Sequence, residues 1–409
     1  MYDTLIIGAR AAGSPTAMLL ARKGYRVLLV DKATFPSDAP RGHVIHVPGV
    51  AQLKKWGLLD KVIASNCPPI RQLTFDLGPF ALIGSFPAID GISEAYNPRH
   101  KVLDTILVDA ARTSGAEVRE GFSVQELLMD GDRVTGIRGR AGDGKTVTET
   151  ACIVIGADGM HSSVARTVQA PTYYTKSPLT CAYYTYYSGV PMEGGEMYLR
   201  GTRLFGVAPT NDGLVCGFVQ FPHQEFHTFR RDIAGNFQKL LDLVPELAER
   251  IHNGKQEERF VGTADLPNFF RKPYGPGWAL VGDAGYHKDP FTGQGITDAF
   301  RDAELLAEAL DAGFTGRSSL EDALANYEQQ RNNHVQPMYE FTCQLASFEP
   351  PAVEMQQLFA ALRGNQTETD RFLGTIAGTV PIPEFYTPEN MQRIIGSASA
   401  DLDTSLASR

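Results

Sequence analysis

Glycine and acidic residues near the N-terminus have the types and the spacing that hold a dinucleotide. An apolar run at residues 5–7 leads into Gly8, a turn of small residues ends at Gly13, and a second apolar run at residues 27–30 ends at Asp31. Glycine lets the chain turn tightly, and the helix start that follows offers N–H groups to a pyrophosphate. An acid about 20 residues further on can accept hydrogen bonds from a ribose. This stretch therefore predicts a nucleotide-binding strand–helix–strand unit.

The pattern departs from G-x-G-x-x-G at its second glycine, which is replaced by Arg10. That glycine normally lets the backbone approach a phosphate. We expect Arg10 either to reach past the phosphates toward the ligand or to shift the ligand slightly. An ordinary α/β crossover would not need an acid at position 31.

Two further apolar strands, at residues 152–155 and 278–281, run into turns that carry glycine and aspartate. In the turn after residues 152–155, Asp158 either contacts a ligand or simply caps the next helix, since a carboxylate at a helix start accepts from free N–H groups. The second turn leads into a long helical pattern, so a second helix start is aimed at the strand ends. The residues that mark these turns are Gly156, Asp158, Gly159, Gly282, Asp283, Pro290, Gly293 and Gly295.

A long polar connection follows Asp31 and contains Arg41, His43 and His46. Loops of this length are usually functional. These residues are either solvated or line a ligand cleft.

The candidates for proton transfer are His46, Tyr286 and His287, because imidazole and phenol groups near a reacting centre can give or take a proton. We expect at least two of the three only to pack or to form hydrogen bonds. Lys288 and Asp289 are expected to pair with each other.

The elements that must position these residues follow from periodicity and turn signals. Residues 172–270 are aromatic, β-branched and alternating, which predicts a large antiparallel sheet. The residues expected to populate its two faces are Tyr183, Tyr184, Tyr186, Tyr187, Met197, Tyr198 and Phe205. About half of them should be plain core or surface, and the sharper hypothesis is that an aromatic inner face also walls a pocket. Helices are expected at 48–56, 99–113, 235–253 and 318–348, and shorter ones at 350–395, before a frayed tail of about a dozen residues. Further strands are expected at 71–77, 80–86, 116–118, 122–129, 133–140 and 145–150, with a hairpin at 130–132.

Composition limits the class of protein. A length of 409 residues suggests two or three domains. The formal net charge of −9 argues against a nucleic-acid partner. Five scattered cysteines fit free thiols in a reducing cytoplasm, and no metal-ligand cluster is visible. No signal peptide or membrane-spanning run is expected, so the predicted location is cytoplasmic.

The three turns together resemble those of the group A flavoprotein monooxygenases, a superfamily that includes p-hydroxybenzoate hydroxylase, flavin halogenases and geranylgeranyl reductases. The resemblance covers residues 1–60, 99–170 and 275–330. It implies that Asp283 holds the ribityl chain of FAD and that the Pro290 and 293–296 turn lies along the isoalloxazine ring. The positions implied to bind FAD are Gly8, Arg10, Ala12, Gly13, Asp31, Lys32, Arg41, Arg99, Asp158, Gly282, Asp283, Pro290, Gly293, Gly295 and Ile296.

The resemblance also implies the domain organisation. A three-layer α/β, Rossmann-like FAD-binding domain would comprise residues 1–70, 99–171 and 273–330. An inserted antiparallel β-sheet substrate domain would comprise 71–98 and 172–272, and a helical region 331–409.

The activity implied is that of an FAD-dependent monooxygenase. Such an enzyme hydroxylates or epoxidises an aromatic or polycyclic small molecule through a flavin C4a-hydroperoxide, with O2 and a transient NAD(P)H or a separate flavin reductase. The alternatives are a reductase of prenyl double bonds, a halogenase, and an FAD-binding structural or sensor protein. The halogenase signature W-x-W-x-I-P cannot occur, because Trp56 and Trp278 are the only tryptophans.

Overall fold

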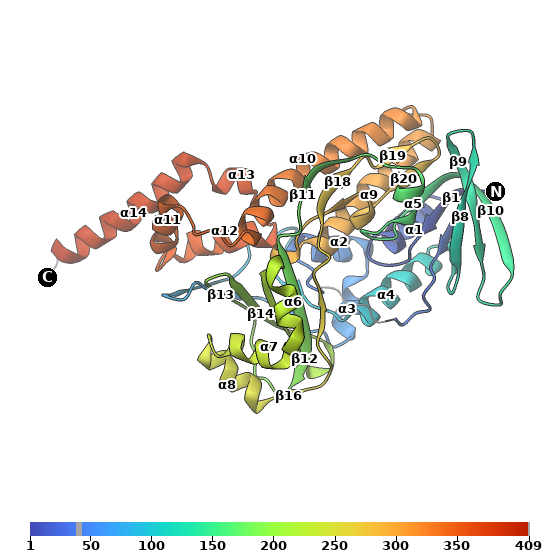
Figure 1. Cartoon of the computed structure of the whole chain (residues 1–409). Coiled ribbons are helices and arrows are strands. Elements are labelled where there is room, and N and C mark those ends of the chain that lie inside the picture. Colours follow the sequence, from blue (N-terminus) through green and yellow to red (C-terminus); the bar gives the residue numbers. More distant parts are fainter. Residues whose placement is uncertain (38–42, 408–409) are drawn as a thin grey trace.

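The computed structural model describes residues 1–37 and 43–407, with side chains up to residue 397. Figure 1 shows a sheet covered by helices, a second sheet beside it, and a group of C-terminal helices on the far side. The last of these helices projects away from the body of the molecule.

The first sheet is mainly parallel, and its strands run in the order β19-β20-β10-β1-β2-β7. Of these six strands, only β19 is antiparallel to its neighbour; it pairs with β20 at one end of the order. Because parallel strands end at the same edge, the turns after β1, β10 and β20 are brought together. The bounds are β1 Tyr2–Ile7, β2 Val27–Val30, β7 Glu117–Arg119, β10 Thr146–Gly156, β19 Tyr274–Gly275 and β20 Trp278–Leu280.

This sheet is the middle of three layers. On one face Ile6, Leu29 and Ile155 pack in the core with helices α1 (Gly13–Arg22), α4 (His100–Thr113) and α9 (Gly295–Phe314). The alternate residues Leu5 and Leu28 pack on the other face against a hairpin formed by β8 (Ser123–Asp130) and β9 (Arg133–Arg140). The three-layer prediction is confirmed, and so is the hairpin at residues 130–132.

The second sheet has the order β16-β12-β15-β14-β13-β4-β5, with β17 paired to β12. It is antiparallel except where β13 pairs with β4 in parallel. Helices α6 (Phe226–Phe229), α7 (Ile233–Leu241) and α8 (Pro245–Asn253) lie against one face. The strands are β4 Leu73–Asp76, β5 Ala81–Gly84, β12 Thr180–Ser188, β13 Gly195–Arg200, β14 Arg203–Pro209, β15 Val215–Pro222, β16 Lys255–Gln256 and β17 Val261–Thr263.

Shorter elements connect these parts, and a helical region follows them. The connecting elements are α2 (Val47–Trp56), α3 (Leu59–Ala64), α5 (Ser163–Thr167), β3 (Pro69–Ile70), β6 (Ala95–Tyr96), β11 (Thr172–Lys176), β18 (Asn268–Arg271) and β21 (Tyr286–His287). The C-terminal helices are α10 (Leu320–Ala346), α11 (Val353–Leu362), α12 (Gln366–Ala377), α13 (Ile382–Phe385) and α14 (Pro388–Ala407).

Three predicted elements differ from the structure. The helix expected over 235–253 is two helices, because Pro245 occupies the first turn of α8 and cannot continue α7. The strands expected at 145–150 and 152–155 form one continuous strand, β10. The C-terminal tail expected to be frayed is helical to Ala407.

Replacing Gly13 with alanine tests the close packing of α1 on the sheet. A Cβ at position 13 would lie 1.8 Å from the carbonyl oxygen of Gly8. We expect Gly13→Ala to lower the free energy of unfolding by about 1–3 kcal/mol, as overpacking does, measured by urea unfolding. Gly396→Ala is the control, because nothing lies within 4 Å of its new methyl group. Equal stability of both variants would contradict the close approach.

Candidate active site

The three predicted turns lie in contact at one edge of the parallel sheet. A Cβ on Gly8, whose φ is +105°, would lie 2.4 Å from the Ala157 carbonyl oxygen. A Cβ on Gly282, whose φ is +60°, would lie 2.8 Å from the Ala12 Cβ. Side chains at these glycines would separate the turns, so only glycine permits this arrangement.

The Asp31 carboxylate lies at the end of β2 beside the first turn. It accepts hydrogen bonds from the backbone N–H groups of Ala9 (2.7 Å) and Ala33 (2.8 Å). A carboxylate can accept about four hydrogen bonds, so roughly half of its capacity remains for a ribose. The residue fits the predicted contact.

The guanidinium of Arg10 is directed toward α4. It pairs with the fully buried Asp104 and lies 3.2 Å from the Ser37 hydroxyl and 5.6 Å from the centre of the Phe35 ring. Lys32 is exposed and has no polar side-chain partner in the described part of the chain. Arg41 lies outside the described residues.

Asp283, in the 3-10 turn η4 (Gly282–Ala284), is half-buried, and its carboxylate pairs with no other described residue. A half-buried anion without a partner is costly, so it is suited to accept from ligand hydroxyls. Nearby, η5 (Pro290–Thr292) and Gly293 lead into α9, whose first residue Gly295 has open space where a Cβ would stand. Ile296 is buried behind this start. The site therefore has an open helix start beside an unpaired acid.

Asp158 and Arg99 have structural partners. The Asp158 carboxylate accepts from the N–H (2.6 Å) and the hydroxyl (2.7 Å) of Ser163 at the start of α5, so its capping role is confirmed. Arg99 precedes α4 and points toward the second sheet. Its Nη2 lies 2.5 Å from Glu258 Oε1, and its guanidinium lies 4.6 Å from the centre of the Tyr186 ring.

His46 is a neutral, buried histidine against the turn before α9. Burial lowers its pKa to about 4, although its hydrogen bond to Thr292 opposes this effect. Its Nε2 lies 2.9 Å from the Thr292 carbonyl oxygen and must therefore carry the proton. Its Nδ1 is left as a buried acceptor without a partner among the described residues.

Tyr286 is buried and His287 is half-buried, and both rings pack on aromatic neighbours. The Tyr286 ring lies 4.7 Å from that of Phe270, and burial raises the pKa of its phenol well above the usual value. His287 stacks on Phe269 and contacts the carbonyl oxygen of Pro267 through Nδ1. A catalytic role for either residue stays a prediction.

The predicted pairing of Lys288 with Asp289 is wrong. Lys288 pairs instead with Asp298 in the first turns of α9, and Asp298 also binds Arg301 at 2.8 Å. Burial raises the pKa of Asp298, but the two cations outweigh this effect and hold it below its usual range. Lys288 and Asp289 are adjacent in the chain, but their side chains point in different directions, Lys288 toward α9 and Asp289 toward the second sheet.

Alternate residues of β12 and β15 form an inner face, which is turned toward the first sheet. It comprises Ala182, Tyr184, Tyr186, Cys216, Phe218 and Gln220. The residues between them pack beneath α6–α8, as do Tyr198 and Phe205. The prediction that the aromatic residues divide between core and a second face is confirmed.

Contacts at two places join the inner face to other segments, one to His43 in the loop before α2 and one to Asp289 just before η5. At one end the Tyr186 hydroxyl lies 2.7 Å from His43 Nε2. At the other end the Asp289 carboxylate accepts from Thr180 (2.7 Å) and Gln220 (2.5 Å). Thr180 and Tyr186 are six positions apart on β12, which is about 20 Å of strand. Sequence reasoning missed both partnerships, although the alternation of tyrosines in β12 was a signal for one of them.

The inner-face residues between the two contacts keep accessible surface. Ala182, Tyr184 and Phe218 are half-buried, whereas Val219 and Phe221 on the other face are fully buried. Cys216 is also half-buried, although burial raises the pKa of its thiol to about 12. The side chains of the inner face are therefore less completely covered than those of the other face.

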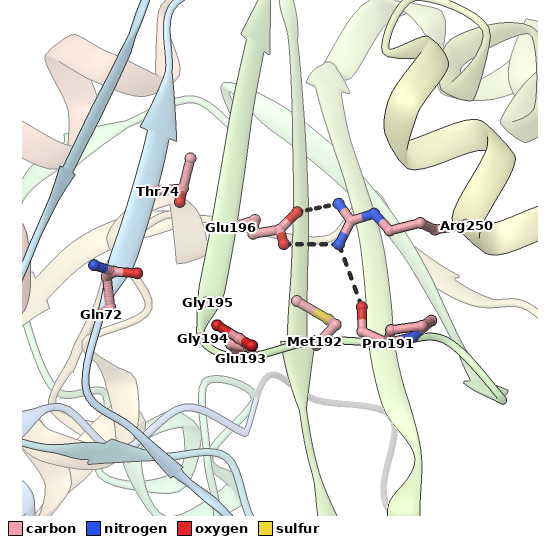
Figure 2. Close-up of a pocket in the computed structure, with 9 residues that line it drawn as sticks. All are labelled: Gln72, Thr74, Pro191, Met192, Glu193, Gly194, Gly195, Glu196 and Arg250. Carbon is pink, nitrogen blue, oxygen red and sulfur yellow. Dashed lines mark hydrogen bonds and ion pairs between the residues drawn. The ribbon is translucent and has the colours of Figure 1, made fainter.

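A polar hollow of about 270 Å³ lies elsewhere, on the outer face of the second sheet near β13 and β4. Figure 2 shows the Glu196 carboxylate and the Arg250 guanidinium pointing toward one another. They are joined by contacts of 2.8 and 2.5 Å. Because these charges satisfy each other and Glu196 faces away from the three turns, the hollow is separate from the candidate site.

No group of three potential metal ligands occurs among the described residues. None of the described helices is both long enough and apolar enough to cross a bilayer.

Replacing Lys288 with methionine tests its buried ion pair with Asp298 in α9. Removing one partner leaves Asp298 with a buried charge that Arg301 alone must balance, so we expect a loss of about 3–5 kcal/mol in the free energy of unfolding. The double variant Lys288→Met/Asp298→Leu should recover much of this loss. If both variants are equally destabilised in urea unfolding, the pair does not interact as the structure has it.

Comparison with known proteins places the chain among flavoproteins. A family model described as "FAD binding domain" matches residues 1–342. The chain is 29% identical over 342 residues to digeranylgeranylglycerophospholipid reductase of Methanosarcina acetivorans, covering 81% of this chain and 80% of that protein. It is also 29% identical over 378 residues to kynurenine 3-monooxygenase of Salinispora tropica, covering 84% and 79% of the two chains.

The fold is shared with solved flavoprotein structures. The myxobacterial chondrochloren halogenase superposes with a TM-score of 0.79 at 20% identity, covering 97% of this chain and 96% of that one. With the matched turns and the shared fold, the chain belongs to the FAD binding domain family and is an FAD-dependent oxidoreductase of the flavoprotein monooxygenase superfamily.

Proposed function

We propose that the chain is a monooxygenase that adds one oxygen atom from O2 to an aromatic or polycyclic small molecule. NAD(P)H serves as the transient reductant, or a separate flavin reductase supplies the electrons. The observation that carries the proposal is the half-buried aromatic inner face. It is joined at both ends to segments that flank residues 290–296, the turn expected to lie along the flavin ring.

FAD, when bound, supplies the redox chemistry and activates oxygen. The first turn would hold its pyrophosphate, Asp31 its ribose and Asp283 its ribityl chain. The start of α9 at Gly295 would place N–H groups near the negative charge of the reduced ring. The neutral His46 fixes the Thr292 carbonyl in this turn and adds no charge to it.

A reductase of prenyl double bonds is the second candidate, because the archaeal digeranylgeranylglycerophospholipid reductase matches four-fifths of the chain. The two activities differ in their use of oxygen. A monooxygenase needs O2 and an enclosed site for its substrate, whereas a reductase delivers hydrogen to carbon without O2.

Asp283→Ala tests the cofactor assignment. The change removes the unpaired carboxylate expected to bind ribityl hydroxyls, so we expect most of the FAD to be lost on purification, measured as flavin absorbance relative to protein. Asp60→Ala, at an exposed acid of α3, is the control and should keep its FAD. Normal FAD content in Asp283→Ala would refute this role.

Reduction without oxygen separates the two candidate activities. The FAD-loaded protein is reduced anaerobically with NADH and, separately, with NADPH, and is then mixed with O2 in a stopped-flow spectrometer. A monooxygenase should show a transient absorbing species that is neither oxidised nor reduced flavin. Direct reoxidation without it, together with hydrogenation of geranylgeraniol by the reduced enzyme, would favour the reductase.

A further inference from the structure

Phe218 on the inner face lies flat over a glycine. Gly206 of β14 is directly opposite Phe218 of β15. A Cβ at position 206 would lie 2.0 Å from Cε1 and 2.1 Å from Cζ of the Phe218 ring. Side chains normally stand perpendicular to a sheet, so this ring occupies the room that the glycine leaves.

The flat ring lies in an apolar row that crosses the sheet. Tyr184 pairs with Phe218 on one side, and Met197 pairs with Gly206 on the other. Neighbouring strands are about 4.8 Å apart, so this row of four positions is about 14 Å long. Such a length accommodates a two-ring aromatic molecule.

Packing alone does not account for Phe218. An aromatic ring often covers a cross-strand glycine to protect the backbone, and in that role it would be covered by other side chains in turn. Phe218 instead remains half-buried, whereas Val219 and Phe221 of the same strand are fully buried. Phe218 also packs against a small buried cluster of Leu204, Phe291 and Ala346, in which Phe291 belongs to η5 before α9.

We propose that the Phe218 ring is the floor of the substrate site and that Gly206 sets its depth, so that the enzyme selects flat aromatic molecules that stack on this ring. This inference rests on the proposed function. Stacked aromatic rings gain about 0.5–1.5 kcal/mol beyond the area they bury. A side chain at position 206 forces the ring upward into the space that the substrate needs.

The test compares two probes with the same carbon skeleton, planar 2-naphthol and saturated 2-decalol. Their dissociation constants are measured by equilibrium dialysis against the FAD-loaded protein. We expect the wild type to prefer 2-naphthol by up to about tenfold, and Phe218→Leu to remove this preference. Gly206→Ala and Gly206→Val should weaken 2-naphthol binding progressively and leave FAD content unchanged.

Gly217→Ala is the matched control in the same sheet. Its new methyl group would face Tyr187 on the outer face, at 3.3 Å, and should not change 2-naphthol binding. Equal binding of the two probes by the wild type, no binding of either, or unchanged 2-naphthol binding in a folded Gly206→Val would overturn this inference. The proposed function is tested separately, by the FAD content of the protein and by its reaction with O2.

Discussion

The close approach of backbone at three turns is the constraint on which the rest of the structure depends. Gly8 and Gly282 each bring a turn to within a few ångströms of a neighbouring one, and both have positive φ angles that favour glycine. The parallel strands bring their ends to one edge, but glycine lets the turns meet there. The helix starts that follow can therefore share a single ligand.

The second sheet depends on this edge through side chains. Polar residues at the two ends of its inner face reach His43 and Asp289, and a buried polar contact is costly to leave unmade. These contacts connect the sheet to the loop before α2 and to the turn before α9. The apolar residues between them keep accessible surface, whereas those of the outer face form a core beneath α6–α8.

Charge is also balanced close to the turn. Lys288 and Arg301 are matched by Asp298 and Asp302, which lie in the first turns of α9. Ions removed from water need such compensation. Lys288 directly follows β21, so its pair with Asp298 joins the segment before η5 to α9. By contrast, the ion pair in the outer hollow of the second sheet joins Glu196 of β13 to Arg250 of α8.

The sequence alone determined the nucleotide-binding strand–helix–strand unit and the glycine turns, because hydrophobic periodicity and glycine spacing are local properties, and its resemblance to a known family implied the three-layer fold. It predicted the hairpin at 130–132 and the helix over 318–348, and it identified the turns that meet. It did not determine the partners of Lys288, Asp289 or His43. His43 and Tyr186 are 143 residues apart, and Thr180 and Asp289 are 109 apart. The alternation in β12 shows which tyrosines share a face, but it does not identify the distant residue that each one contacts. That depends on how two sheets are placed against each other, and only the tertiary structure decides it.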